Sequence, residues 1–180
     1  MSPTVIAVSS RRRHSIGKDP KASIDLVAGL GVEGDAHFGR TTQHLYLLRK
    51  DPTRPNLTQV HLLHAELHDR LNRIGFDISP GMLGENITTR GLDLMALPSG
   101  TQLKVGNDPI LQVTGCRQPC SKLDRVKPGL MDATFIRDSF GCLIPNLGIM
   151  AVVLRGGVVR TGDGIEVIFP DEPHLPLLPV

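Results

Sequence analysis

The segment from Thr114 to Leu123, Thr-Gly-Cys-Arg-Gln-Pro-Cys-Ser-Lys-Leu, brings two cysteines and two cations close together in the chain. Pro119 fixes its own φ angle and disfavours helix at the residue before it, which stiffens the approach to Cys120. Arg117 and Lys122 flank this cysteine, and cations favour the thiolate, the form that attacks electrophiles and binds soft metals. The alternative is a buried cysteine that acts as a small apolar residue. We interpret Cys120 as the catalytic and metal-binding candidate.

The other two cysteines are Cys116 and Cys142. Cys116 forms a C-x3-C pair with Cys120, but structural zinc takes four ligands in paired clusters, and no second Cys/His pair follows at a supporting distance. A zinc site is therefore the minor interpretation. Cys142 lies in the apolar run Gly-Cys-Leu-Ile-Pro and is predicted to belong to the core.

An acid and an imidazole occupy a glycine-rich segment, Gly-Val-Glu-Gly-Asp-Ala-His, at residues 31–37. Asp35 and His37 have side chains that can bind a ligand or transfer a proton. The alternative is structural, because Asp commonly accepts hydrogen bonds from its own backbone in turns. Asp35 and His37 are the catalytic candidates beside Cys120.

Residues 81–91, Gly-Met-Leu-Gly-Glu-Asn-Ile-Thr-Thr-Arg-Gly, combine glycines with many hydrogen-bond donors. Backbone N–H groups, hydroxyls and a guanidinium can together cradle a phosphate. The segment is no P-loop, because no Gly-Lys-Ser/Thr follows, and a turn followed by an edge strand is the alternative. The candidate cofactor-binding residues, with the two cations beside Cys120 included, are Asn86, Thr88, Thr89, Arg90, Arg117 and Lys122.

The elements that must position these residues are mostly strands. Apolar residues recur at helical spacing over residues 60–74, with Gly75 as a stop and Asn56 or Thr58 as a cap, and a weaker helix is expected over Leu130–Ser139. The pairs Gly156-Gly157 and Asp163-Gly164 indicate hairpins. Strands are expected at Thr4–Val8, Asp25–Ala28, His44–Leu48, Asn86–Thr89, Gln102–Val105, Ile110–Thr114, Ile149–Leu154 and Ile165–Phe169.

Three histidines, His61, His64 and His68, would form one stripe beside the apolar face of the helix expected over residues 60–74. Neighbouring imidazoles can bind a metal. Half-exposed histidines at the boundary of an amphipathic helix are the favoured interpretation.

The 180 residues suit a single domain, residues 1–180, with a core at about 5–169 and an extended proline-rich tail at 170–180. A charge of +2 and 3% aromatic residues argue against a nucleic-acid polymer as partner. No run of about 18 apolar residues is present, so no membrane span is expected. The N-terminus has no export-signal pattern, which predicts a cytoplasmic protein with reduced cysteines.

Four segments, in order and spacing, resemble the MOSC family, named for the C-terminal domain of molybdenum cofactor sulfurases. They are Gly-Val-Glu-Gly-Asp-Ala-His (31–37), Pro-Gly-Met-Leu-Gly-Glu-Asn-Ile-Thr-Thr-Arg-Gly-Leu (80–92), Arg-Gln-Pro-Cys (117–120) and Val-Leu-Arg-Gly-Gly-Val-Val-Arg-Thr-Gly-Asp (153–163). The resemblance implies a mainly β fold with a few helices (α+β) around a strongly bent, barrel-like sheet.

The resemblance also implies a site for the molybdenum cofactor, molybdopterin, with Cys120 as metal ligand or sulfur carrier. It is closest to the small stand-alone bacterial members, some of which reduce N-hydroxylated small molecules. Pyridoxal phosphate belongs to a fused desulfurase that this chain lacks, so it is not expected here. An enzyme of this kind would need a separate redox partner protein, and a homodimer through β edges or the tail is conceivable. The alternative function is a non-catalytic carrier of sulfur or cofactor, and a third is an interaction domain without a ligand.

Overall fold

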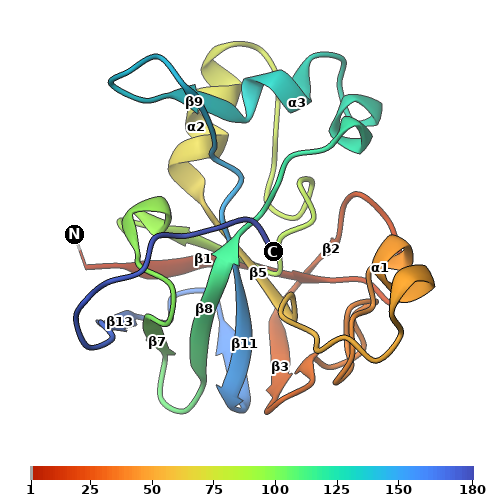
Figure 1. Ribbon diagram of the computed structural model, residues 1–180, viewed down its shortest axis with the longest axis vertical. Helices are drawn as coiled ribbons and strands as arrows, with labels where there is room; N and C mark the ends of the chain where they lie inside the picture. Colours follow the sequence, from red (N-terminus) through yellow and green to blue (C-terminus); the bar gives the residue numbers. More distant parts are fainter. Residues whose placement is uncertain (1) are drawn as a thin grey trace.

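The largest element of the fold is an eight-stranded sheet in the order β13-β7-β8-β11-β5-β6-β1-β2 (Figure 1). The computed structural model describes residues 2–180. Neighbouring strands are antiparallel except β5 and β6, which run parallel. The strands are β1 (Thr4–Ser10), β2 (Asp19–Lys21), β5 (Val60–His64), β6 (Ile87–Arg90), β7 (Gln102–Val105), β8 (Ile110–Cys116), β11 (Ile149–Arg155) and β13 (Ile165–Ile168).

Two smaller sheets and five short helices complete the described structure. The end of the molecule that carries α2, α3 and β9 lies opposite the end reached by β3 and the lower tips of β8 and β11 (Figure 1). The three-stranded sheet has the order β12-β3-β4 and consists of β3 (Ser23–Val27), β4 (Gly31–Val32) and β12 (Gly157–Arg160). In the two-stranded sheet, β9 (Phe135–Arg137) pairs with β10 (Leu143–Pro145). The helices are α1 (Leu45–Lys50), α2 (Ala65–Arg73), α3 (Leu130–Ala133), and the 3-10 turns η1 (Leu94–Ala96) and η2 (Ser121–Arg125).

The predicted mainly β fold with a few helices is confirmed, but the sheet does not close into a barrel over residues 2–180. Its edge strands are β13 and β2. The two ends of the sheet approach each other where an isolated bridge joins Thr4 to Gly164 and the amide of Val5 donates to the carbonyl of Asp163 at 2.8 Å. The barrel-like description is therefore corrected to an open, curved sheet. None of the helices in this range has the length and apolarity to cross a membrane.

Every strand expected from sequence forms except His44–Leu48, but the two glycine pairs do not make hairpins. β12 leaves β11 and pairs with β3, while β13 pairs with β7. A Cβ on Gly156 would lie 2.5 Å from the carbonyl oxygen of Leu26. Glycine is required there because two backbones approach closely, which a sequence pattern does not distinguish from a turn.

Of the helix expected over residues 60–74, only the second part forms as a helix, and the first part is a strand. Residues 60–64 form β5, and α2 begins at Ala65 with His64 as its N-cap, so neither Asn56 nor Thr58 caps it. A strand buried on both faces is apolar without alternation, and here that run also fits the helical period. Gly75 ends the helix as predicted, with φ +92°. The parallel pair β5 and β6 is thus joined through α2, which makes a βαβ connection.

Two further expectations are corrected. Residues 44–48 belong largely to α1, an exposed helix without buried residues, because Leu and Tyr there have no strand to pair with and Leu favours helix. The helix expected over Leu130–Ser139 ends at Ala133, and the chain continues into β9.

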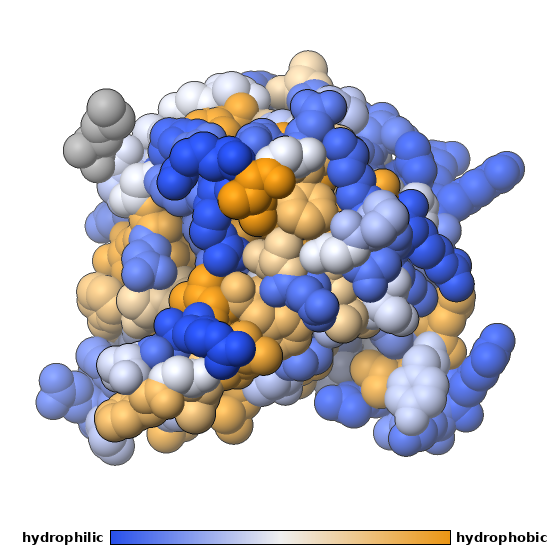
Figure 2. Space-filling view, turned by 90° about the horizontal axis from the view of Figure 1, so that it is seen from above, coloured by the Kyte–Doolittle hydropathy of each residue, from blue (hydrophilic) through white to orange (hydrophobic). Residues whose placement is uncertain are grey.

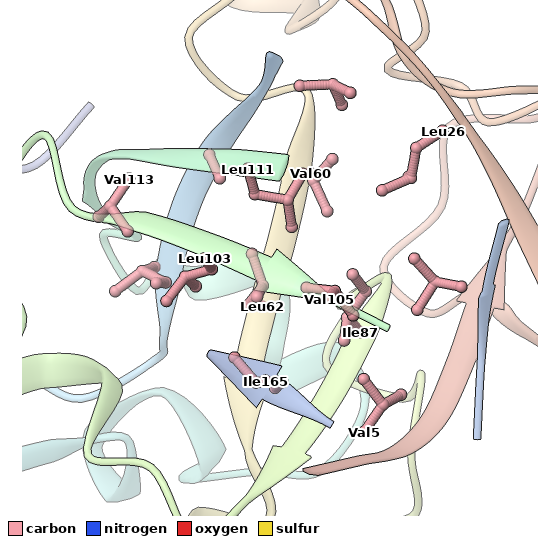
Figure 3. Close-up of a cluster of buried hydrophobic side chains, with 14 of the residues drawn as sticks. Val5, Leu26, Val60, Leu62, Ile87, Leu103, Val105, Leu111, Val113 and Ile165 are labelled. Carbon is pink, nitrogen blue, oxygen red and sulfur yellow. The ribbon is translucent and has the colours of Figure 1, made fainter. Parts of the chain in front are cut away.

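Two apolar clusters hold the fold together. The larger lies inside the curved sheet, where side chains from β1, β3, β5, β6, β7, β8 and β13 converge (Figure 3). The smaller lies between α2 and the chain that follows β8; its members are Leu63, Leu67, Leu71, Ile78, Leu83, Leu123, Leu130 and Leu147. Because Leu83 and Leu123 belong to the second cluster, it supports the two loops that carry the site residues.

The C-terminal segment, residues 170–180, is an extended strap without a named helix or strand, as its proline spacing predicts. It is fixed by isolated bridges from Leu175 to Ser99 and from Pro179 to Cys116. The amide of Cys116 donates to the carbonyl of Leu178 at 2.9 Å. The strap therefore covers the end of β8, four residues before Cys120.

Candidate functional site

Cys120 lies where a central strand of the sheet turns into a 3-10 helix. β8 ends at Cys116, the amide of Arg117 donates to the carbonyl of Gly148 at 3.0 Å, and Cys120 is the N-cap residue of η2. Leu123 anchors that turn in the smaller apolar cluster. The thiol is exposed and in no disulfide. Of the two interpretations of Cys120, burial in the core is excluded.

Arg117, three residues before this cysteine, carries a largely buried guanidinium. Its Nη1 donates to the carbonyl of Leu83 and to His61 Nδ1, the latter at 3.0 Å. No carboxylate lies within ion-pair distance of it among residues 2–180. Burial lowers the pKa of Arg117, and the negative charges of Glu85 and of the Cys120 thiolate oppose that effect. The guanidinium of Arg117 therefore lies in the same electrostatic environment as Cys120.

His61 is buried in β5 and fixes the orientation of Arg117. Its Nε2 lies 2.8 Å from the carbonyl of Leu147, so Nε2 carries the proton and Nδ1 accepts from Arg117. Burial, followed by the charge of Arg117, lowers the pKa of His61 to about 3, and the imidazole is neutral. The expected half-exposed stripe is wrong for His61 and also for His68, which is buried on α2.

Glu85 is a buried site residue that the sequence interpretation did not single out. Its Oε1 accepts from the amide of Gly81 at 2.7 Å and from Thr88 Oγ1 at 3.2 Å, and lies 3.3 Å from His68 Nε2. Burial would raise the pKa of Glu85, but the hydrogen bond and charge of His68 outweigh it and hold the pKa below its usual value. The signal in the sequence is a single acid two residues before the β-branched run that begins β6.

Asp35 organises the opposite wall of the site. It is 6% exposed, and it accepts from Lys18 Nζ at 2.5 Å and from Asn86 Nδ2 at 3.1 Å. It also accepts from the amide of His37 at 3.0 Å, the structural role foreseen as the alternative, while His37 Nδ1 lies 3.3 Å away. Burial would raise the pKa of Asp35, but His37 and Lys18 hold it well below its usual range.

Lys18, which the sequence interpretation also missed, is almost fully buried against Asp35. Burial lowers the pKa of Lys18, and the charge of Asp35 opposes this shift. Arg117 lowers the same pKa further, so the two buried cations share one electrostatic environment. Because Asp35 neutralises Lys18, Arg117 is the cation of this pair that lacks a carboxylate partner within residues 2–180.

Three histidines and Lys122 surround the exposed side of the site. The rings of His14 and His37 meet edge to face at 5.2 Å. Burial, then the charges of His37 and Lys122, lowers the pKa of His14. Burial, then the charges of Lys122 and His37, lowers that of His44. Loops that are distant in sequence therefore converge on Lys122, two residues after Cys120.

The side-chain donors of Asn86 and Thr88 point inward and are engaged within the protein, whereas Thr89 Oγ1 is buried without a hydrogen-bond partner within residues 2–180. Asn86 Nδ2 donates to Ser9 O and Asp35 Oδ2, and its Oδ1 accepts from the amide of His61. Thr88 donates to Glu85, and Thr89 is fully buried. The segment does not form the open phosphate cradle that we expected. Its role is to position Asp35 and Glu85.

Arg90 lies away from these groups, at the far end of β6 from Asn86. Its guanidinium makes a bidentate pair with Asp69 of α2 at 2.8 and 3.2 Å. Of the cofactor-binding candidates, Arg117 and Lys122 are the ones that the fold brings to Cys120.

Cys116 and Cys142 lie outside the site around Cys120. Burial raises the pKa of Cys116, which lines an open, mostly apolar cavity of about 520 Å³ beneath the C-terminal strap. Cys120 does not line that cavity. Cys142, predicted to be core, is exposed, because Asp138 caps the turn between β9 and β10 and holds it in solvent. Within residues 2–180 no group of three metal-ligating side chains is preassembled.

The fold and this site define a small, mainly β protein with one accessible thiol set against buried cations. The chain belongs to the MOSC domain family, whose family model matches residues 35–166. MOSC domains are associated with molybdenum-cofactor binding.

Similar proteins support this assignment. YuaD of Bacillus subtilis (strain 168) is 29% identical over 150 residues, which covers 76% of each chain. The crystal structure of YuaD superposes with a TM-score of 0.75 at 24% identity, covering 95% of this chain and 98% of YuaD. YiiM of Geobacillus stearothermophilus gives a TM-score of 0.67 at 20% identity, covering 97% of this chain and 79% of YiiM. These structural similarities establish the fold.

The residues at the site fit a group that is anionic and carries a soft metal. The exposed Cys120 thiol is a soft ligand, and Arg117 and Lys122 supply positive charge for phosphate or thiolate groups. The carboxylates that a hard cation would need, Asp35 and Glu85, are buried and already paired with cations or imidazoles. The molybdenum cofactor has this combination of charge and softness.

Proposed function

We propose that this protein is a molybdenum-cofactor oxidoreductase that reduces N-hydroxylated small molecules, with Cys120 as the protein ligand of the metal. The observation that carries the proposal is an accessible thiol in front of Arg117, a buried guanidinium without a carboxylate partner. When bound, the cofactor would supply the two-electron chemistry that breaks an N–O bond. Membership of the MOSC family supports this class of cofactor.

The chain itself would bind the cofactor, orient the thiol and neutralise the negative charge of the cofactor. Arg117, oriented by His61, stabilises negative charge at Cys120. Lys122, which is exposed, would hold the anionic parts of the cofactor. The rigid attachment of β8 to the strap keeps the thiol in place.

His37 is the residue best placed to deliver a proton. Its Nδ1 faces Asp35, so Nε2 is left on the other side of the ring without a recorded partner within residues 2–180. A carboxylate that orients an imidazole is a common proton-transfer arrangement. Reduction of an N–OH group consumes two electrons and two protons and releases the oxygen as water.

A carrier of sulfur or cofactor is the second candidate function. The name of YuaD refers to metal–sulfur cluster biosynthesis. An exposed thiol that a cation favours as thiolate is also what a persulfide carrier needs.

The test uses protein made in a host that synthesises the cofactor, with Cys142→Ser as the matched control because Cys142 is the other exposed cysteine. We expect wild type and Cys142→Ser to contain molybdenum by elemental analysis and to reduce an N-hydroxylated base, and Cys120→Ser to lose both. Molybdenum retained in full by Cys120→Ser would refute the proposed ligand. A persulfide on Cys120 without turnover of the base would establish the carrier instead.

A further inference from the structure

The open cavity beneath the C-terminal strap is not used by the proposed chemistry. It has a volume of about 520 Å³, and its walls come from four parts of the chain that are distant in sequence. These parts are residues 95–98 in and after η1, the end of β8, β10 and the strap. Small-molecule sites in proteins commonly have volumes of about 300–1,000 Å³. The cavity is therefore large enough for a small organic ligand.

The walls of the cavity are continuous with the main core. Leu97 is a buried member of the larger apolar cluster, and Met95 and Leu177 pack against that cluster, one from η1 and the other from the strap. The strap is fixed to the body of the protein where the amide of Ser99 donates to the carbonyl of Leu175 at 2.9 Å. Both sides of the cavity are thus held in place without a ligand, as is usual for small-molecule sites.

The side chains that line the cavity provide no fixed charge. Among residues 2–180, no lysine, arginine, aspartate or glutamate lines it, and its titratable groups are Cys116 and His174. Burial raises the pKa of the Cys116 thiol, which is therefore neutral. The ring of His174 stacks on Phe169, and its Nε2 lies 3.1 Å from the carbonyl of Pro170. An ionic ligand would leave water for walls without a counter-charge, which is costly.

The backbone of the walls offers few free hydrogen-bond donors. The amides of Ala96, Leu97 and Cys116 already donate to carbonyls within the protein. Proline has no backbone N–H, and four of the lining residues are prolines, namely Pro98, Pro145, Pro176 and Pro179. A phosphate or carboxylate group, which needs several N–H donors, is therefore poorly matched to these walls.

We propose that this cavity binds an uncharged, apolar small molecule built from aromatic rings, at a site separate from Cys120. Removal of apolar surface from water, on the ligand and on the walls, supplies the binding free energy. Figure 2 looks onto the end of the molecule that carries α2, α3 and β9, and shows apolar residues over the middle and left of that face. Figure 1 places β9 and the strap on the same side. The inference does not depend on the proposed function, because neither Cys120 nor Arg117 lines the cavity.

The test compares two fluorescent probes that share one ring system and differ in charge. Phenylnaphthylamine is neutral, and anilinonaphthalene sulfonate is the same molecule with an added sulfonate. We expect the whole chain to bind phenylnaphthylamine saturably, with one molecule per chain, and to bind the sulfonate about tenfold more weakly or less. Equal affinity for the two probes would overturn the proposed class of ligand.

Two variants of neighbouring residues on β10 place the binding site. Ile144 lines the cavity and Leu143 does not, although both are on the surface, with 38% and 59% of the residue exposed. Neither substitution by glutamate therefore disturbs the core. We expect Ile144→Glu to weaken the binding of phenylnaphthylamine about tenfold, because it puts a charge into the wall. Leu143→Glu is the matched control and should bind as wild type does.

A third variant separates a cavity from an adhesive apolar surface. Ala96→Trp adds an indole that fills part of the cavity, so we expect it to weaken binding about tenfold, although it makes the protein more apolar. Binding that Ala96→Trp strengthens, or that Leu143→Glu and Ile144→Glu weaken equally, would overturn the proposal. A dimer in solution that Ile144→Glu dissociates, without binding of phenylnaphthylamine to wild type, would overturn it in favour of a contact between two copies of the chain.

Discussion

At the scale of single residues, Arg117 connects the interior of the protein with its reactive thiol. The guanidinium is buried, yet its hydrogen bonds go to the neutral acceptors Leu83 O and His61 Nδ1 and to no carboxylate. A buried charge without an adjacent counter-ion is costly. Negative charge at Glu85 and at position 120 raises the pKa of Arg117 and so offsets part of this cost.

The role of Arg117 can be measured by alkylating Cys120 with iodoacetamide in a Cys142→Ser background, which removes the other exposed thiol. We expect Arg117→Met to slow alkylation at pH 7 several-fold, and Arg117→Lys to retain most of the wild-type rate because it keeps the charge. Arg117→Met should also lower the free energy of unfolding by about 2 kcal/mol, since it leaves two buried acceptors unpaired. An unchanged alkylation rate in a folded Arg117→Met variant would show that the guanidinium has no influence on the thiol.

At the scale of elements, the turn over residues 81–84 lets two loops approach each other. A Cβ on Gly84 would lie 2.5 Å from the carbonyl of Ile16 and 3.4 Å from Arg117 Nη1, and Gly84 has φ +86°. The carbonyl of Gly81 accepts from the amide of Lys18 at 2.8 Å. The turn therefore holds the β1–β2 loop against the guanidinium that supports Cys120.

Gly84→Ala should cost more than Gly75→Ala, although both glycines have a left-handed backbone. Gly75 has φ +92° and no atom within 4 Å of an added Cβ, so its variant reports backbone strain alone, about 1 kcal/mol. We expect Gly84→Ala to lose a further 1–2 kcal/mol or so in urea unfolding, because Ile16 must move. It should also alter the alkylation rate of Cys120, and Gly75→Ala should not. Equal losses in the two variants would mean that the close approach is unimportant.

The strands and loops that form the site show which features can be predicted from sequence patterns and which cannot. The strands and the motif around Cys120 follow from local chemistry: β-branched runs, a proline that stiffens the loop, and flanking cations. The helix expected over residues 60–74 fails because burial on both faces of β5 removes the alternation that identifies a strand. The donors of Asn86 and Thr88 were expected to face a ligand. The direction in which a side chain points depends on its partners in the fold, which are Asp35 for Asn86 and Glu85 for Thr88.

At the scale of the whole molecule, the site is joined to the core by buried titratable groups. His61, on β5, bonds the carbonyl of Leu147, a member of the smaller apolar cluster. Glu85 and His68 link the turn over residues 81–84 to α2. Because these groups sit where sheet, helix and loops meet, their protonation affects global stability and not only the site.

Acid should therefore destabilise the protein in two stages. His61 has its pKa lowered by burial to about 3, so it is neutral when folded, while in the unfolded chain it takes up a proton below about pH 6.5. Stability is fully present above pH 6.5 and falls as the pH drops toward 3, by about 2–3 kcal/mol between pH 7.5 and 4.5 from this residue alone. The lowered pKa values of Asp35 and Glu85 add a second loss below about pH 4.5. Urea unfolding at about pH 7.5, 5.5 and 4.5 measures the first stage, and unfolding at about pH 4.5 and 3 measures the second.

His61→Gln identifies the residue responsible for the first stage, because glutamine can replace both hydrogen bonds but does not titrate. We expect this variant to be less stable than wild type at pH 7.5 but to lose clearly less stability between pH 7.5 and 4.5. His174→Gln is the matched control, since His174 is exposed on the C-terminal strap and its substitution should leave the slope unchanged. If the stability of His61→Gln falls with pH as steeply as that of wild type, protonation of His61 does not link acid to unfolding. The interpretation of His61 as a neutral imidazole that orients Arg117 would then be wrong as well.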